Sequence, residues 1–300
     1  MVLGIQRMGL VFGPLWGLRQ GPPGAVLRRV TGYNGRMRYP FFLRVAYVGT
    51  DFSGWQIQST LRSVQGELWK ALQALDPEAP MPAGTGRTDA GVHARAQGVL
   101  AQTAKAWDTY RLLAALNAHL PWDARVLTAE PAPAGFFPRA HAVAKRYVYR
   151  IQEGPAADPF LHGRCWHVYG LTPLDRAAMA AAAAHLEGRH DFSSFRHREC
   201  VAPSPVRTIY RIRLQGDRPG LELAFEGNRF LMHMVRIMAG TLVEVGRGRI
   251  APEAVPGILA ARDRRRAGIT APAEGLCLEQ VWYQQCWGIG EPSPWPEDPQ

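Results

Sequence analysis

The sequence predicts an α+β protein in which helices pack on one side of a mostly antiparallel β-sheet. Expected strands outnumber expected helices, several strands follow one another directly, and both halves of the chain carry the same mixture. A chain of 300 residues with 47% apolar and 20% charged residues can bury a substantial core without a metal or disulfide. A boundary between two mixed subdomains is expected near residues 140–146.

The first half of the chain opens with a strand and a helix. Residues 41–48, FFLRVAYV, are rich in β-branched and aromatic side chains, which is typical of a buried strand. Ser63 can cap a helix whose apolar residues recur on one face up to Leu75, and the prolines that follow end it. Further elements expected here are strands at 97–102 and 124–130 and a helix over 110–120.

The second half continues with alternating and helical patterns. Alternation in KRYVYRI predicts a strand at 145–151 with Tyr147 and Tyr149 on one face. A helix is expected to start with Thr172 as its N-cap and to end at Gly188. The other expected elements are a strand pair at 207–215 and 220–227, a helix over 230–245, a last strand at 275–283 and a loose Pro-rich tail over 287–300.

Two kinds of segment are missing from the sequence. No apolar run approaches the roughly 20 residues that span a bilayer, so we expect no membrane segment. The four cysteines lie far apart without a C-x-x-C pair, which argues against a zinc ribbon or a disulfide framework and favours a reducing compartment. Two His/Cys groups lack the usual ligand spacing, so no metal is expected there: His190, His197 and Cys200, and His162, Cys165 and His167.

One segment, GTGRTDAGVHARAQ at residues 84–97, is too polar for a core. Its glycines permit unusual backbone angles and close approach, but their spacing matches neither a P-loop nor a dinucleotide-binding fingerprint. Arg87, two residues before Asp89, would stabilise the carboxylate and leave a nucleophile at neutral pH. The alternative is a tight turn in which Asp89 caps backbone N–H groups.

The segment GRTDAGVHA resembles the signature motif of the TruA family of tRNA pseudouridine synthases. Further segments resemble family motifs, in family order, between about residues 41 and 284: YVGTDFSGWQIQ, SVQGELWKAL, RAHAVAKRYVYRI, EGRHDFSSFR, NRFLMHMVRIMAGTLVEVGRG and APAEGLCLEQVWY. The resemblance implies the pseudouridine synthase fold, with a cleft between two subdomains. These would be residues 40–143, which carry the aspartate loop, and residues 144–286.

The resemblance also implies roles for two residues in isomerising uridine to pseudouridine without a cofactor. Asp89 would be the nucleophile, attacking C6 of the base or C1′ of the ribose. The glycosidic bond would break, the uracil would turn, and C5 would rejoin C1′. Tyr147 would stack on the target base and is the candidate for removing the C5 proton, although a phenol with a pKa near 10 is a poor base. The alternative is that Tyr147 only fills the sheet face.

Two further residues match family positions: Arg236 matches the helix arginine that pairs with the catalytic carboxylate, and Leu276 matches the apolar residue beside the base. Arg236, seated among apolar helix residues, would be partly buried and so needs an anion, for which Asp89 is the natural partner. The alternative is a structural bridge to Glu244 or Glu226. Leu276 would pack beside the base or, alternatively, only in the core.

Basic residues are expected to hold the RNA through its phosphates. Arg87 and Arg139 match positions that engage the flipped nucleotide, and Lys145 stands where many family members have arginine. The residues suited to phosphate contact are Arg87, Arg95, Arg139, Lys145 and Arg146. The run over 262–266 is more typical of a solvated face. Expected partners are an RNA, most readily tRNA, and a second copy in a homodimer; the competing hypothesis is a non-catalytic RNA-binding or assembly protein.

The positive charge is concentrated at the N-terminus. Of the net charge of +10, seven units come from arginines in residues 1–50, where no acid precedes Asp51, so the remainder carries +3. Such a segment is typical of a mitochondrial transit peptide, although serine is absent before Ser53. We expect residues 1–39 to be a basic leader in a mitochondrial family member. The alternatives are a basic arm that touches RNA, and a cytoplasmic or nuclear location.

Overall fold

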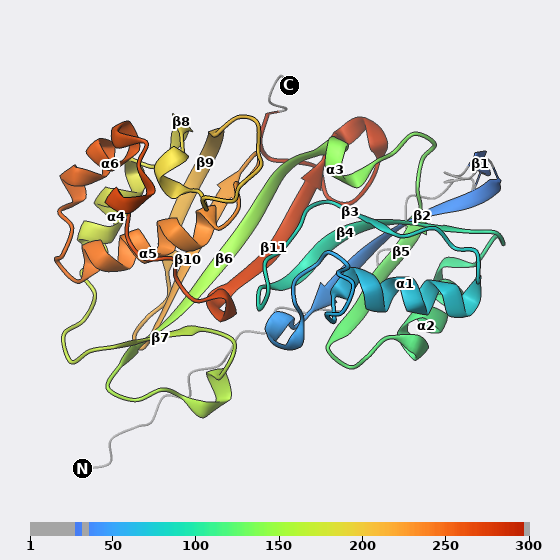
Figure 1. Cartoon of the computed structure of the whole chain (residues 1–300), viewed down its shortest axis with the longest axis horizontal. Coiled ribbons are helices and arrows are strands. Elements are labelled where there is room, and N and C mark those ends of the chain that lie inside the picture. Colours follow the sequence, from blue (N-terminus) through green and yellow to red (C-terminus); the bar gives the residue numbers. More distant parts are fainter. Residues whose placement is uncertain (1–27, 32–35, 297–300) are drawn as a thin grey trace, which may run out of the picture.

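The computed structural model describes residues 28–31 and 36–296, and the expected leader lies mostly outside these ranges. Its described strands form one sheet (Figure 1). They run in the order β1 (Val30–Thr31), β2 (Met37–Tyr47), β4 (His93–Thr103), β11 (Leu276–Tyr283), β6 (Ala142–Gly154), β10 (Gly220–Gly227), β9 (Val206–Gln215) and β8 (Gly188–Asp191). Beside this path, β3 (Ala83–Gly84) pairs with β4, β5 (Ala124–Pro131) with β2, and β7 (Trp166–Tyr169) with β6.

The sheet is mostly antiparallel, and its exceptions explain how the two halves join. Within the described sheet, β11 runs parallel to β4, and β7 runs parallel to β6. Because the last strand, β11, inserts between β4 from the first half and β6 from the second, both halves share one sheet (Figure 1). The boundary expected near residues 140–146 therefore overlaps the start of β6. The predicted α+β class is confirmed.

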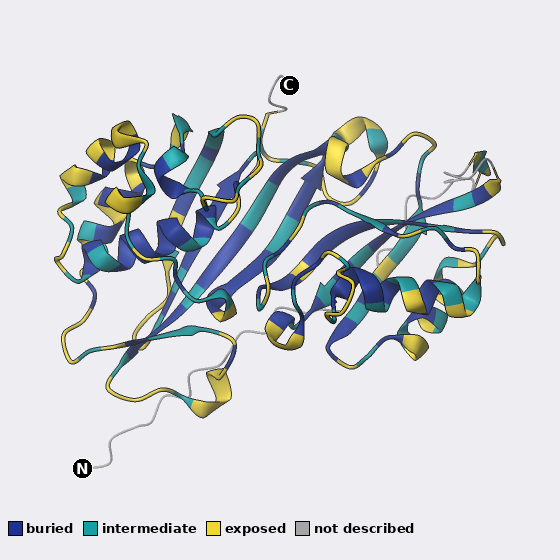
Figure 2. Ribbon diagram, in the orientation of Figure 1, coloured by how far each residue is buried: buried dark blue, intermediate teal, exposed yellow. Residues whose placement is uncertain are grey.

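Helices gather at the two ends of the sheet (Figure 1). Near the first half lie α1 (Val64–Leu75) and α2 (Thr109–His119), and near the second lie α4 (Arg176–Ala184), α5 (Met234–Gly246) and α6 (Val255–Ala261). The short α3 (Pro138–His141) leads directly into β6. Buried residues concentrate in the central strands and on the inner sides of the helices, whereas the outer turns are exposed (Figure 2). As predicted, Ser63 caps α1, and its side chain accepts a hydrogen bond from the Gly66 N–H.

The helix predicted to run from Thr172 to Gly188 is shorter than expected at both ends. Its N-cap is Asp175, whose side chain accepts a hydrogen bond from the Ala178 N–H at 2.9 Å. Thr172 loses this role because the Leu174 N–H is held by the Glu153 carboxylate at 2.9 Å, which ties the preceding chain to β6. Gly188 instead begins β8.

The helix predicted over residues 230–245 starts later than expected. His233 has φ +61°, in the left-handed region, so it is the N-cap, and α5 begins at Met234. A left-handed non-glycine residue cannot continue a right-handed helix, and periodicity does not reveal it.

The C-terminal segment over residues 287–296 is packed, contrary to the predicted loose tail. Trp287 stacks on His141 of α3 with ring centroids 4.3 Å apart. Trp295 stacks on Tyr210 of β9 at 4.9 Å. Aromatic side chains thus hold this segment against α3 and β9. Residues 297–300 lie outside the described part of the chain.

Strand β2 begins at Met37, inside the segment predicted as leader, and it contains a buried arginine. Arg38 is 1% exposed, donates to Asp76 Oδ2 at 2.6 Å and to the Glu78 carbonyl at 2.6 Å. Removing the cation from such a pair lowers the stability of a protein by several kcal/mol, because the carboxylate is left without a counter-charge.

We expect Arg38→Met to lower the free energy of unfolding by about 3 kcal/mol, because Asp76 keeps its burial but loses its counter-charge. Chemical denaturation of the purified variant measures this loss. Arg36→Met is the matched control, since Arg36 pairs with Glu78 at the surface, where ion pairs contribute little. Equal stability of the two variants would contradict a structural role for Arg38.

Candidate active site

The loop that carries Asp89 is fixed by hydrogen bonds to the first half of the chain. The Thr88 carbonyl accepts from the Trp55 N–H at 3.1 Å, and the Thr88 hydroxyl lies 2.8 Å from the Tyr47 hydroxyl. The Gly91 N–H donates to the Phe52 carbonyl at 3.2 Å. The loop is therefore held on both sides of Asp89.

The glycines of this segment allow other side chains of the protein to pack closely on the loop. Gly91 has φ +80°, a left-handed conformation that favours glycine. A Cβ on Gly84 would lie 2.6 Å from the Trp55 ring, and one on Gly86 would lie 2.7 Å from the Lys145 amine. The close approach predicted for these positions thus involves neighbouring side chains that pack on the loop.

The Asp89 carboxylate meets Arg236 from α5. Arg236 Nη1 lies 3.1 Å from Asp89 Oδ2, and the side chains of Asp89 and Arg236 are 25% and 14% exposed. Arg236 Nε also donates to the Ala271 carbonyl at 2.8 Å, which orients the guanidinium. The expected Arg236–Asp89 pair is present. The alternative anions are engaged elsewhere, Glu244 by Arg247 and Glu226 by Arg146.

A second basic side chain reaches the same carboxylate oxygen and was missed by sequence reasoning. His233 Nε2 lies 3.5 Å from Asp89 Oδ2, and its side chain is 19% exposed. Burial lowers the pKa of His233, although the Asp89 charge opposes this shift and the Arg236 charge adds to it. The spacing of His233 and Arg236 in HMVR was the available signal, but the left-handed backbone that aims the ring leaves no trace in the sequence.

Arg87 does not neighbour Asp89 in the predicted way. Its side chain is exposed, and no ion pair joins it to any residue of the described chain. The cation beside Asp89 is Arg236, which is 147 positions away in sequence. Proximity in sequence was misleading here, because side chains two residues apart need not meet.

Tyr147 lies on β6 close to the carboxylate and within the core. It is 8% exposed, and its ring packs edge-to-face on Phe230 with centroids 5.2 Å apart. Burial raises the pKa of Tyr147, and the Asp89 charge raises it further. Removing its own proton is thus unfavourable, which makes Tyr147 a poor general base.

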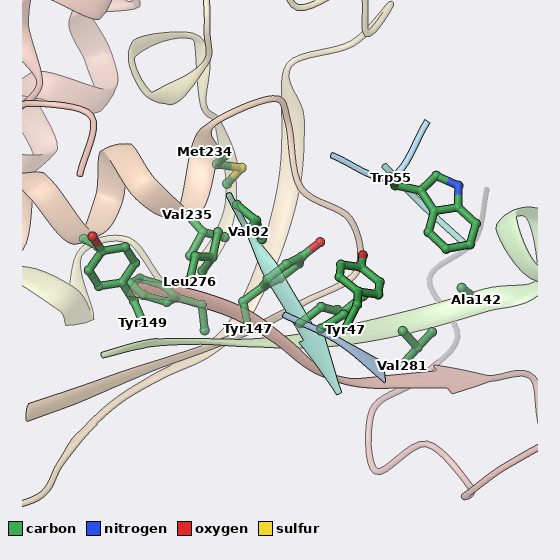
Figure 3. Close-up of a cluster of buried hydrophobic side chains, with 14 of the residues drawn as sticks. Tyr47, Trp55, Val92, Ala142, Tyr147, Tyr149, Met234, Val235, Leu276 and Val281 are labelled. Atoms are coloured by element: carbon green, nitrogen blue, oxygen red, sulfur yellow. The ribbon is translucent and has the colours of Figure 1, made fainter. Parts of the chain in front are cut away.

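Figure 3 places Tyr147 among apolar side chains of several elements. The Tyr147 and Tyr47 hydroxyls point the same way, whereas Tyr149 points elsewhere and donates to the Pro272 carbonyl at 2.7 Å. Leu276 is 5% exposed and pairs with Tyr149 across β11 and β6. Leu276 therefore packs in the core, and its contact with the target base stays a prediction.

The basic residues predicted to bind substrate divide into two groups. Arg139 on α3 is exposed, and Lys145 on β6 lies over Gly86 with Nζ 3.5 Å from the Thr85 carbonyl. Within the described chain, neither of these two side chains has an ion pair with an acid. They can therefore receive an external anion.

Arg146 and Arg95 are each paired with a glutamate of the protein. Arg146 Nε donates to Glu226 Oε1 at 2.6 Å, and its guanidinium lies over the Trp282 ring. Arg95 pairs with Glu279 at 3.4 Å. Because Arg146 alternates with Tyr147 along β6, it points to the opposite face, which argues against its predicted substrate contact. In the run over 262–266, Arg262 pairs with Asp191, Arg265 pairs with Asp263, and Arg264 donates to the Gly268 carbonyl.

The described residues contain neither a metal site nor a membrane-spanning helix. No group of three or more His, Cys, Asp or Glu side chains is placed to hold a metal ion in this part of the chain. None of its helices combines the length and apolarity needed to cross a membrane. The four cysteines are free thiols.

The phosphate contact predicted for Lys145 should make RNA binding sensitive to pH. Burial, followed by the charges of Arg229 and Arg139, lowers the pKa of Lys145 to about 8. The cation is therefore present below pH 8 and is lost as the pH rises through that value. We expect RNA affinity to fall by up to about tenfold between pH 7 and pH 9, since one unit above the pKa about a tenth of the amine stays charged.

The matched variant is Lys145→Arg, because a guanidinium stays charged throughout this range. Its RNA dissociation constant, measured at fixed salt, should change less between pH 7 and pH 9 than that of the unmodified protein. Identical pH dependence in the two proteins would contradict the predicted phosphate contact of Lys145.

Comparison with known proteins adds an independent finding. Residues 182–284 match a family model described as tRNA pseudouridine synthase. The chain is 44% identical over 247 residues to tRNA pseudouridine synthase A of Moorella thermoacetica, covering 80% of this chain and 98% of that protein. It is also 44% identical over 244 residues to the protein of that name from Caulobacter vibrioides (80% and 97% covered), and 40% identical over 241 residues to that from Geotalea uraniireducens (80% and 98%).

Proposed function

This chain belongs to the tRNA pseudouridine synthase A family, and from that membership we propose that Asp89 is the nucleophile with which it isomerises uridine to pseudouridine in tRNA. The assignment rests on the surroundings of the Asp89 carboxylate, which is both paired with a cation and accessible. Asp89 Oδ2 is held by Arg236, while the side chain keeps a quarter of its surface open. A carboxylate that only capped a turn would need neither a partly buried guanidinium beside it nor access to solvent.

The proposed reaction balances without any added reagent. An electron pair of the Asp89 carboxylate forms a bond to C1′ of the ribose or C6 of the uracil, and the C1′–N1 bond breaks with its pair going to the base. The uracil turns, C5 forms a bond to C1′, and the bond to Asp89 breaks, which restores the carboxylate. A proton leaves C5 and N1 gains one, so that only the connectivity changes.

Basic side chains that have no acidic partner suit the handling of a flipped nucleotide. Extruding a base from structured RNA costs a few kcal/mol, and contacts to flanking phosphates can supply this without reading sequence. Arg87, Arg139 and Lys145 are the candidates, because none of them has an acidic partner in the described structure. Tyr147 is proposed as the stacking partner of the base, and Leu276 as the apolar residue beside it.

The test uses tRNA transcripts that carry tritium at C5 of uridine. Because the C5 hydrogen is lost only when C5 joins C1′, we expect tritium release to water together with pseudouridine at defined positions. RNA binding without release, by folded protein and across a full set of tRNAs, would favour the competing hypothesis of a non-catalytic RNA-binding or assembly protein.

A mitochondrial location is part of the proposal. Its support is the concentration of arginine and the absence of acids in residues 1–50. A fluorescent protein fused after residue 40 should collect in mitochondria. Fluorescence in the cytoplasm or nucleus would favour those compartments, with the segment acting as a basic arm on RNA.

A homodimer is proposed as the working assembly. Its support is the family resemblance, from which a second copy of the chain is expected. Sedimentation of the purified protein at several concentrations should give twice the chain mass. A single-chain mass at every concentration would contradict this assembly.

A further inference from the structure

We propose that His233 is a positioning residue for Asp89, that its ring and the Arg236 guanidinium together fix Oδ2, and that protonation of this ring sets the acidic limit of activity. The inference rests on the proposed role of Asp89 as nucleophile. It concerns which carboxylate oxygen is free to react and what neighbouring charge that oxygen experiences.

Two side chains converge on a single oxygen of Asp89. Arg236 Nη1 lies 3.1 Å and His233 Nε2 lies 3.5 Å from Oδ2. No other residue in the described chain contacts this carboxylate through an ion pair or a side-chain hydrogen bond. Oδ1 is therefore the oxygen left to face a nucleotide. The His233 contact is longer than a good hydrogen bond, and contacts of this kind tighten when substrate binds.

The backbone supports a specific placement of the ring. His233 has φ +61° at the N-cap of α5, a conformation that is costly for a non-glycine residue and persists only where the surroundings enforce it. Its carbonyl accepts from the Ile237 N–H at 2.9 Å, so the first turn of α5 starts from this residue. The same helix therefore delivers both His233 and Arg236 to Asp89.

The groups around His233 favour its uncharged form. Asp89 and Arg236 are close to the ring, the His197 ring lies 4.5 Å away between centroids, and the Arg264 charge also acts on it. Burial, Arg236, His197 and Arg264 lower the pKa of His233, and only Asp89 raises it. At neutral pH the ring then offers a single N–H, which we assign to Nε2 because that nitrogen faces the carboxylate.

Protonation of the His233 ring lowers the reactivity of the Asp89 carboxylate and leaves the fold unchanged. A second full positive charge beside Oδ2 draws electron density from Asp89 and weakens the electron pair that Oδ1 donates to C1′ or C6. His233 transfers no proton in either bond-forming step, so its effect passes through Asp89 alone. The rate is therefore expected to fall as the pH falls through the pKa of His233.

The decisive variant is His233→Asn. Asparagine tolerates the left-handed backbone and does not titrate, but its shorter side chain places the amide nitrogen near the position of Nδ1, so it does not reach Asp89 Oδ2. We expect its kcat at pH 7.5 to fall as in an alanine variant, and the acidic fall attributed to His233 to disappear. His233→Ala removes the donor and should lower kcat by about 10-fold to 100-fold with little change in KM, which is the range expected for a hydrogen bond to a charged group.

His197→Asn is the matched control, because His197 touches His233 and lies outside the contacts of Asp89. It should keep both the rate and an acidic fall. An acidic fall that survives in His233→Asn, or a His233→Ala variant with unchanged kcat, would overturn the inference. If His233→Ala does not fold, as judged by its melting temperature, the pH profile of His233→Asn decides. Turnover by Asp89→Asn would instead remove the premise, so the two failures are distinguishable.

Discussion

Asp89→Asn is expected to abolish pseudouridine formation, lowering the single-turnover rate by at least about 10⁴-fold, while the protein still folds and binds tRNA. The amide has the same shape as the carboxylate, and its oxygen can still accept from Arg236. What it lacks is the anionic electron pair that forms the bond to the nucleotide. Tritium release from C5-labelled tRNA measures the rate, and filter binding measures the affinity.

The fold of this variant should change little. The Asp89→Asn substitution leaves Arg236 with a neutral acceptor, at a cost of about 1 kcal/mol, because the site is partly open to water. Asp51→Asn is the matched control, since Asp51 is an exposed acid on the neighbouring 3-10 turn Gly49–Asp51. It should retain full activity. Turnover by the Asp89 variant at more than a trace of the original rate would falsify the nucleophile assignment.

Much of the fold could be predicted because its elements depend on local patterns. Alternation located β6, β9 and β10, and an apolar stripe with a serine cap located α1. The failures occurred where tertiary contacts chose between local options. Thr172 and Asp175 are both acceptable caps, and only the Glu153 contact to the Leu174 N–H selects the second. The tail was misjudged because the stacking partners of its tryptophans lie far away in sequence.

The candidate site was predictable to a similar degree. Asp89 and Arg236 came from motifs at distant positions, and the structure brings them together because β11 joins the two halves beside β4. Arg87 was paired with Asp89 from adjacency alone, which takes no account of where side chains point. His233 could not be placed in advance, since its contact depends on one backbone torsion.

Arg236→Met is expected to lower both stability and rate, because the apolar side chain keeps the packing within α5 but removes every contact of the guanidinium. The hydrogen bonds to Asp89 Oδ2 and to the Ala271 carbonyl are lost together. We expect the free energy of unfolding to fall by about 2 kcal/mol, less than for a fully buried pair, because water can reach Asp89. The rate should fall by at least about 100-fold, since the nucleophile is no longer oriented.

Two comparisons separate orientation from simple loss of charge. Arg236→Lys keeps the charge but cannot make both contacts from one planar group, so its rate should lie between those of the original protein and the Met variant. Arg249→Met removes an exposed cation that pairs with Glu244, and it should change neither property. Unchanged melting and an unchanged rate in Arg236→Met would mean that the pair with Asp89 has no role in the reaction. A loss of stability with a normal rate would confine Arg236 to the fold, and the orientation of Asp89 would then have to come from His233 and the loop.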